Sequence, residues 1–384
     1  MRMVRCVEVV AAAGLVVLAG VSCTKDREGL RGERGLSESV SRRVTVTEDL
    51  TVFTLFALLN AAGYDDEHLP QMHPVRVRVR NALAAKLDPA LRQRLRAFYD
   101  AHRGHADPWA YSVVAKATSG PPAFTPTPDW NDIQKNERFG SLDDLHDLMP
   151  MFYAAADVPG LYDGVRIDYV EYVRAYEMEI RRQVVAVLNY CRVRDVEALG
   201  AAPPGERSEA LVIPNLLDSY EHAFSFELGG RFISIEGPQP KIGYNPHEFV
   251  HAVTNPAVYS AATRALDARL QPLVDEASKA LGGDAAFGSA EAFVDECLVR
   301  AISLRYLAGE RGERRATLVK TMNDEYRSGY ILERFFWDQL ERYEASSADL
   351  RTFYPVILAS LDPEAELARW REAHGRAATP AAAR

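Results

Sequence analysis

The chain has 384 residues, of which 47% are hydrophobic and 26% are charged, so it can bury a large core without metals or disulfides. Its formal net charge of -9 at pH 7 argues against a nucleic-acid binder, which needs clustered Lys and Arg to displace counterions from phosphates. Arg76, Arg78 and Arg80 alternate with valines, and we interpret this run as one solvated face of a strand or helix end.

The N-terminus carries a segment typical of export. Two arginines precede an apolar run from Val9 to Val21, which Ser22 and Cys23 follow. The run is too short to span a membrane, so it predicts a signal peptide over residues 1–22. A small residue directly before a cysteine resembles a bacterial lipobox, which implies cleavage before Cys23 and a lipid anchor on its thiol. We therefore expect an exported, membrane-anchored lipoprotein of the bacterial cell envelope.

The remaining chain divides into a tether and two regions. Residues 23–43 are charged and contain scarcely any large apolar side chain, which predicts a flexible tether. A helical N-terminal region is expected over 44–205, and a second region over 206–384. Apolar spacing predicts helices over residues 50–62, 89–102, 141–156 and 168–194, with a Pro-rich break at 121–128 and another break at 201–205.

After residue 205 the apolar period changes from helical to alternating. Phe224, Phe226 and Leu228 alternate with polar residues, and an apolar run over 232–235 follows Gly229–Gly230. Two short strands joined by Gly-Gly predict a β-hairpin with a primed turn. Further helices are expected over residues 258–281, 289–308, 315–343 and 347–361. The expected fold class is mainly α with a small antiparallel β-sheet.

One motif carries chemistry: the run from His247 to His251 matches H-E-x-x-H. Residues four apart on a helix lie about one turn apart on one face, so the imidazoles of His247 and His251 can bind the same Zn²⁺. The carboxylate of Glu248 lies to the side of that pair. There it can act as the general base that deprotonates a zinc-activated water.

The same residues allow a purely structural interpretation. Asn245 and Glu248 have the N-cap and N3 spacing of a capping box, in which the glutamate only ties off the start of a helix. Both histidines would then be ordinary helix residues. This helix is expected to end near Asn255, because Pro256 disfavours the helical conformation in the residue before it. We favour the metal interpretation for three reasons. The motif follows a predicted hairpin, it lies on a helix with apolar residues, and it belongs to a chain that we expect to be exported.

A catalytic zinc site usually takes a third protein ligand and leaves a position for water. The extended H-E-x-x-H-x-x-G-x-x-H motif is absent, so we expect a carboxylate as the third ligand. The helix predicted over 289–308 offers Glu291, Asp295 and Glu296 among apolar residues. A carboxylate on this helix either faces solvent or points inward, where it would have a functional role such as binding the metal.

An H-E-x-x-H helix followed by a helix with an inward glutamate resembles the gluzincin group of zinc peptidases. The stretches 214–215, 229–238, 247–256 and 296–306 are similar to an uncharacterised bacterial family of gluzincin-like lipoproteins. The resemblance implies a zinc metallopeptidase whose zincin-like catalytic region covers 206–384. It also implies that the hairpin strand borders the cleft and holds an extended peptide or protein substrate by main-chain hydrogen bonds.

The resemblance implies Glu296 as the third ligand beside His247 and His251. Glu291 stays open as an alternative, as does the interpretation that Glu296 is a surface residue. Arg300, one helical turn on, would either orient the Glu296 carboxylate or form a plain surface salt bridge.

Several roles are left open by the residues alone. The candidate donors to the developing oxyanion of a scissile amide are Tyr244, Tyr259, His222 and Arg300. Without the signal peptide and Cys23, two cysteines remain, Cys191 and Cys297, which either pair or stay buried as free thiols. The rival function is a catalytically inactive zincin-fold lipoprotein that binds or scaffolds other molecules. The intact Glu248 favours the enzyme.

Overall fold

The computed structural model describes residues 43–65, 72–104, 106–193, 209–220, 222–239, 247–282, 287–310 and 315–378. Over these ranges the chain is mainly helical with one small sheet, which confirms the expected mainly α class. None of the helices in these ranges is long and apolar enough to cross a membrane. The expected signal peptide, Cys23 and the tether up to residue 42 lie outside the described residues.

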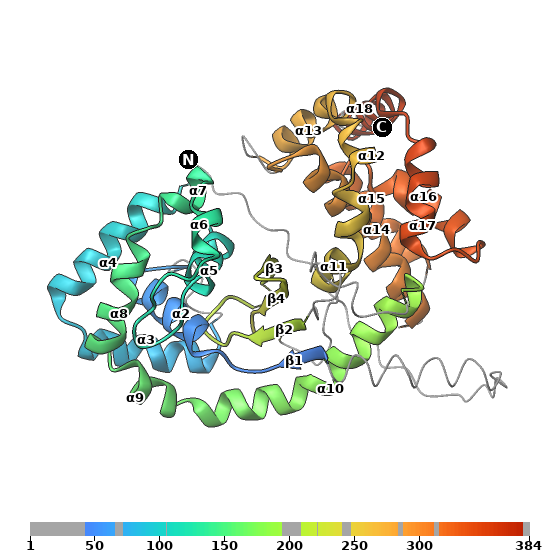
Figure 1. Cartoon of the computed structure of the whole chain (residues 1–384). Helices are drawn as coiled ribbons and strands as arrows, with labels where there is room; N and C mark the ends of the chain where they lie inside the picture. The colour runs from blue at the N-terminus through green and yellow to red at the C-terminus, as the bar shows by residue number, and fades with distance from the viewer. Residues whose placement is uncertain are drawn as a thin grey trace, which may run out of the picture. The chain divides into compact units, whose positions relative to one another are not determined.

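The chain divides into two compact units (Figure 1). We call the described residues within 39–185 and 195–249 the sheet unit, and those within 186–194 and 250–384 the helical unit. This division differs from the expected boundary between residues 205 and 206. The physical reason is strand pairing. The strand over Glu209–Pro214 pairs with the one over Val44–Val46, and the hairpin strands that follow belong to the same sheet, so all of them group with the N-terminal helices.

The sheet has four strands in the order β1-β2-β4-β3. Their bounds are β1 (Val44–Val46), β2 (Glu209–Pro214), β3 (Ala223–Leu228) and β4 (Arg231–Glu236). The predicted hairpin is confirmed: β3 and β4 pair antiparallel, and Gly229 and Gly230 both have positive φ angles, 56° and 71°, as a primed turn requires.

The expected antiparallel sheet was wrong as a description of the whole sheet, because β1 pairs with β2 and β2 with β4 in parallel. Parallel neighbours have no tight turn between them, so the local pattern that revealed the hairpin does not exist for β1 and β2.

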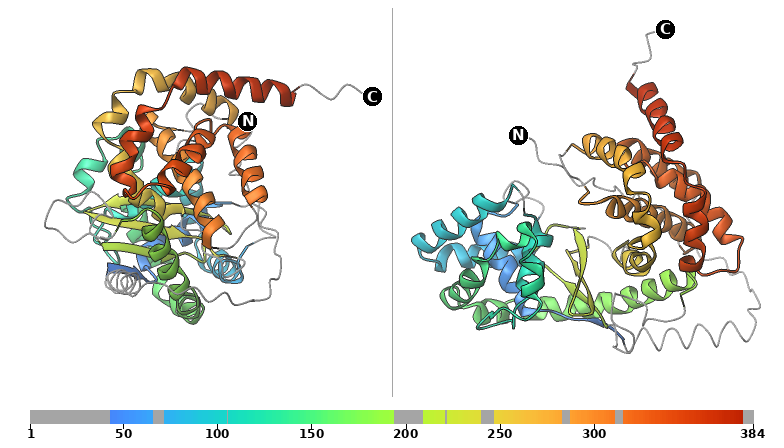
Figure 2. Two further views of the ribbon diagram at one scale, coloured as in Figure 1. Left: turned by 90° about the vertical axis from the view of Figure 1, so that its right-hand side faces the viewer. Right: turned by 45° about the horizontal axis from the view of Figure 1, so that its top comes forward.

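Helices cover one face of this sheet (Figure 2). Phe224, Phe226, Ile233 and Ile235 point into a core that they share with α2 (Leu50–Ala62), which is buried along nearly its whole length. The other helices of the sheet unit are α3 (Pro74–Lys86), α4 (Pro89–His102), α5 (Pro108–Lys116), α6 (Trp130–Ile133), α7 (Glu137–Gly140), α8 (Leu145–Ala155) and α9 (Val158–Asp163). The long helix α10 (Arg166–Tyr190) follows, belonging to the sheet unit up to Val185.

The sequence identifies several helix ends well. α2 and α4 have the predicted bounds, and their first turns are capped by the carboxylates of Asp49 and Asp88. The interpretation of Arg76, Arg78 and Arg80 as one solvated face was wrong. They lie on α3, where alternate residues point about 200° apart, and Arg76 is 1% exposed with its guanidinium 2.8 Å from Asp65.

The helical unit contains a series of packed helices in which α14 and α16 contact each other. Its helices are α12 (Ala261–Arg264), α13 (Asp267–Ala280), α14 (Ala290–Glu310), α15 (Arg315–Ser328), α16 (Glu333–Glu344), α17 (Leu350–Ala359) and α18 (Pro363–Ala378). Phe293, Leu298 and Ile302 of α14 are fully buried. Cys191 and Cys297 are both buried free thiols, so they do not form a disulfide.

Two expected helices are each divided in the structure. The segment 258–281, expected as one helix, contains the two helices α12 and α13 after the end of α11. The segment 315–343 contains α15 and most of α16. Gly329 lies at the second break with a φ of 136°, and a Cβ there would lie 2.9 Å from Leu281 Cγ. Helical apolar spacing continues through both breaks, so it does not reveal them.

The motif helix is α11 (His247–Val258), which belongs to the sheet unit up to Phe249 and to the helical unit from Val250. The expectation that it ends near Asn255 was wrong, since Pro256 lies inside its last turn. A proline that close to the C-terminal end disrupts little of the helix, and the amide of Tyr259 still donates to the carbonyl of Asn255 at 2.9 Å.

Candidate metal centre

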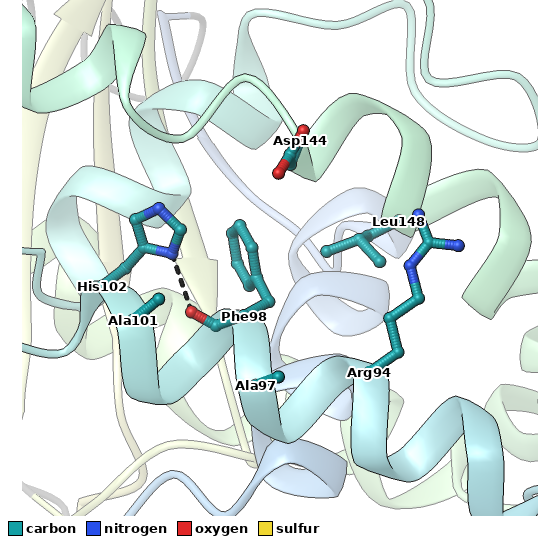
Figure 3. A pocket seen from close by; sticks show the side chains of 7 residues that line it. All are labelled: Arg94, Ala97, Phe98, Ala101, His102, Asp144 and Leu148. Atoms are coloured by element: carbon teal, nitrogen blue, oxygen red, sulfur yellow. Dashed lines mark hydrogen bonds between the residues drawn. The ribbon is translucent and has the colours of Figure 1, made fainter.

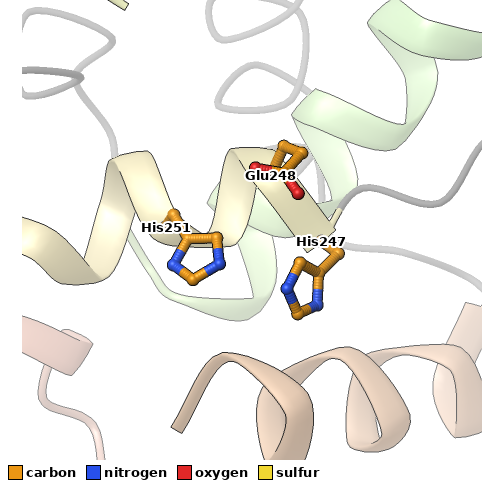
Figure 4. A group of neighbouring side chains, drawn as sticks. All are labelled: His247, Glu248 and His251. Atoms are coloured by element: carbon orange, nitrogen blue, oxygen red, sulfur yellow. The ribbon is translucent and has the colours of Figure 1, made fainter. Parts of the chain in front are cut away.

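The motif residues of α11 form a group that could hold a metal ion. One ligand atom from each of His247, Glu248 and His251 lies within 4.8 Å of the other two. Both imidazole rings project from the same side of the helix (Figure 4), as a four-residue spacing dictates. The two imidazoles are ligands suited to zinc, and Glu248 adds a carboxylate beside them that can act on a metal-bound water, so the residues fit such an ion.

His251 is held from α14 in a defined orientation. Its Nδ1 lies 2.6 Å from Oδ2 of Asp295, a carboxylate that is only 3% exposed. Thr254 donates to the other oxygen of Asp295 at 2.7 Å. A carboxylate accepts but does not donate, so this contact places a proton on Nδ1, and Nε2 is the nitrogen that would bind a metal.

The three carboxylates predicted on α14 have different neighbours. Oε2 of Glu296 lies 3.4 Å from Nε2 of His251, the nitrogen opposite the one that Asp295 engages. Oε1 of Glu291 lies instead 3.4 Å from Nε of Arg264. Of Glu291 and Glu296, it is therefore Glu296 that lies beside the His251 nitrogen that would bind a metal.

A charged cluster lies behind Glu296. Nε of Arg300 donates to Oε1 of Glu296 at 2.7 Å, and the guanidinium lies 3.7 Å from the ring centroid of Tyr330 and 3.4 Å from Glu325. The carboxyl group of Glu333 is fully buried nearby, and burial together with Glu325 raises its pKa well above the usual value. Arg300 is thus engaged from several sides and orients the Glu296 carboxylate.

Glu248 has a partner that the sequence interpretation missed. The hydroxyl of Ser225, in the middle of β3, donates to Oε2 of Glu248 at 2.6 Å. The carbonyl of Ser225 accepts a hydrogen bond from the indole N–H of Trp109 on α5, at 3.0 Å. The only signal in the sequence was that Ser225 is a small polar residue within the alternating pattern of a predicted strand. Asn245, which defines the alternative capping box, lies outside the described residues.

The oxyanion-donor candidates have different surroundings. Nδ1 of His222 lies 2.8 Å from Asp218, which is fully buried and also accepts from Tyr64 at 2.7 Å. Burial works to lower the pKa of His222, but the carboxylate of Asp218 outweighs it, so the pKa is raised. Tyr259 is 44% exposed. Tyr244 lies outside the described residues, and Arg300 is engaged by Glu296.

A separate depression of about 290 Å³ lies on the sheet unit, at α4 and the start of α8 (Figure 3). Its lining residues are Arg94, Ala97, Phe98, Ala101, His102, Asp144 and Leu148. Nδ1 of His102 donates to the carbonyl of Phe98 at 2.7 Å, which is a local helix contact. This lining contains a single histidine, unlike the paired imidazoles of α11.

Compared with protein family models, curated proteins and solved structures, the chain matches none. The resemblance to gluzincins therefore stays a prediction from the residues.

Proposed function

We propose that the protein is a zinc-dependent hydrolase, specifically a metallopeptidase with a zincin-like catalytic region. His247, His251 and Glu296 would bind Zn²⁺, and Glu248 would be the general base. The observation that carries the proposal is the arrangement around His251, where Asp295 engages one ring nitrogen and Glu296 lies beside the other. Asp295 orients the ring as a carboxylate partner of a zinc-binding histidine does, and Glu296 brings a second carboxylate to the nitrogen that would bind zinc.

Different residues of the chain would bind the metal, transfer the proton and hold these groups in position. Zinc bound at this group would supply Lewis acidity that polarises a peptide carbonyl and makes water a nucleophile near neutral pH. Glu248 would take a proton from the attacking water and pass it to the leaving amine. Because Ser225 occupies Oε2 of Glu248, the other carboxylate oxygen is the one oriented for this transfer. Asp295 holds the proton of His251 on Nδ1, and Arg300 holds Glu296 in place.

The position of β3 supports an extended peptide as the substrate. β3 is at the edge of the sheet and also contacts Glu248 through Ser225, and edge strands bind extended chains through main-chain hydrogen bonds. The Ser225 carbonyl already accepts from Trp109. A peptide that pairs with β3 at this residue therefore has to displace the indole. The N-terminal signal and Cys23 support placing the enzyme at the cell envelope.

The test compares the mature protein with Glu248→Gln, which keeps the shape of the side chain but removes its basicity. We expect the variant to bind one zinc with unchanged affinity and to lose about 100-fold to 10,000-fold in kcat, the usual contribution of a general base. Zinc content is measured by atomic emission, and turnover with a library of internally quenched peptides.

Two results would count against the proposal. Equal turnover by both proteins would remove the role of Glu248. Zinc binding with no turnover by the unmodified protein would favour the rival, an inactive zincin-fold lipoprotein that binds or scaffolds.

A further inference from the structure

We infer that Ser225 is a positioning residue for the general base: its hydroxyl couples the edge strand β3 to Glu248 and aims the free oxygen of that carboxylate. The inference rests on the proposed function, because it concerns how Glu248 performs its role. It starts from one contact, the 2.6 Å hydrogen bond from Ser225 Oγ to Glu248 Oε2.

The strand end of this contact is held rigidly. Ser225 lies in the middle of β3 with paired residues on either side, and it stands directly opposite Ser234 on β4. On its other side, the indole N–H of Trp109 donates to its carbonyl at 3.0 Å. The backbone at Ser225 is therefore fixed from both flanks, so the origin of its hydroxyl is fixed as well.

The helix end of the contact is also anchored in the sheet unit. Phe249, the residue after Glu248, is 1% exposed, and its ring centroid lies 5.3 Å from that of Phe232 on β4. Glu248 is itself only 9% exposed. A glutamate side chain has three rotatable bonds, and a charge-assisted hydrogen bond at one oxygen restricts the plane of the carboxylate and the direction of the other oxygen.

The neighbouring serine provides a matched control within the same sheet. Ser234 is fully buried, and its hydroxyl donates to Glu236 rather than to Glu248. The two serines are opposite each other in the register, so their side chains point to the same face of the sheet. Removing either hydroxyl deletes one oxygen from that face, but only the Ser225 hydroxyl holds the general base.

The experiment uses the mature protein with one equivalent of zinc and one quenched peptide that the unmodified protein cleaves. We expect Ser225→Ala to lower kcat by about 10-fold to 100-fold, the fold-change that corresponds to losing a hydrogen bond to a charged group. KM and zinc affinity should stay within about twofold, because neither peptide binding nor the metal ligands depend on the hydroxyl. Ser225→Thr keeps a hydroxyl and suits a strand, so it should restore most of kcat.

Three outcomes separate the possibilities. A normal kcat for Ser225→Ala overturns the inference while leaving the proposed function intact. Equal losses in Ser225→Ala and Ser234→Ala, or no rescue by Ser225→Thr, overturn it too, since they indicate a general effect on the sheet. If the unmodified zinc-loaded protein cleaves none of the peptides, the proposed function fails and the role of Ser225 fails with it.

Discussion

The two units differ in the partners that each gives to its own part of α11. In the sheet unit, Glu248 accepts a hydrogen bond from a neutral hydroxyl on β3, and the next residue, Phe249, packs against Phe232. In the helical unit, His251 meets two carboxylates of α14, one of them braced by Arg300. A base needs its direction set without an added charge that would alter its proton affinity, whereas a metal ligand gains basicity from a neighbouring carboxylate. Changes on the sheet side should therefore alter turnover, and changes on α14 should alter metal affinity.

The largest effect on metal affinity is expected from Glu296→Gln. Loss of a group that only orients a ligand weakens metal binding by about 10-fold to 100-fold. Removal of Glu296, a direct ligand in the proposal, should weaken zinc binding by more than that. Titration against a chromophoric zinc chelator measures this affinity. Glu291→Gln is the matched control on the same helix, because Glu291 contacts Arg264 instead of His251. Weaker zinc binding in the Glu291 variant alone would move the third ligand to that residue.

A smaller loss of metal affinity is expected from Asp295→Asn. The amide cannot hold the Nδ1 proton of His251 as a carboxylate does, so zinc affinity should fall by about 10-fold to 100-fold. The same chelator titration applies. Thr254→Val deletes only the hydroxyl that donates to Asp295, and it should weaken zinc binding less than Asp295→Asn. If zinc affinity were unchanged in Asp295→Asn, its contact with His251 would be structural only.

The smallest effect concerns stability rather than metal binding, and it tests the cluster behind Glu296. Burial first, and then Glu325, raises the pKa of Glu333 above its usual value of 4.5. Its contribution to stability is therefore present below about pH 4.5 and is lost as the pH rises toward the raised pKa. Glu333→Gln stays neutral at every pH. It should leave Tm nearly unchanged at pH 5 and raise it at pH 8 by about 2 °C or more.

Thermal unfolding in the presence of a metal chelator measures the Tm difference between Glu333→Gln and the unmodified protein without a contribution from bound metal. Lys320→Gln, an exposed change on α15 that breaks only a surface ion pair with Asp324, is a control for a general change in charge. A Tm difference for Glu333→Gln that is the same at pH 5 and pH 8 would show that Glu333 does not hold a proton in the folded protein.

The sequence by itself determined the features that depend on near neighbours. The apolar spacing and capping aspartates defined α2 and α4, and Gly229–Gly230 defined the β3–β4 hairpin. The four-residue spacing of His247 and His251 brought both rings to one side of α11. Each of these results follows from backbone geometry and interactions within a few residues, which a linear pattern records directly.

Only the tertiary structure decided which distant groups meet. It set β1 beside β2, although about 165 positions separate them, and it brought Asp295 and Glu296 to opposite nitrogens of His251. It also buried Arg76 against Asp65 and joined Ser225 to Glu248. A local pattern shows that a side chain faces inward but not what it faces, because the partner depends on how whole elements pack, and that packing is a property of the complete chain.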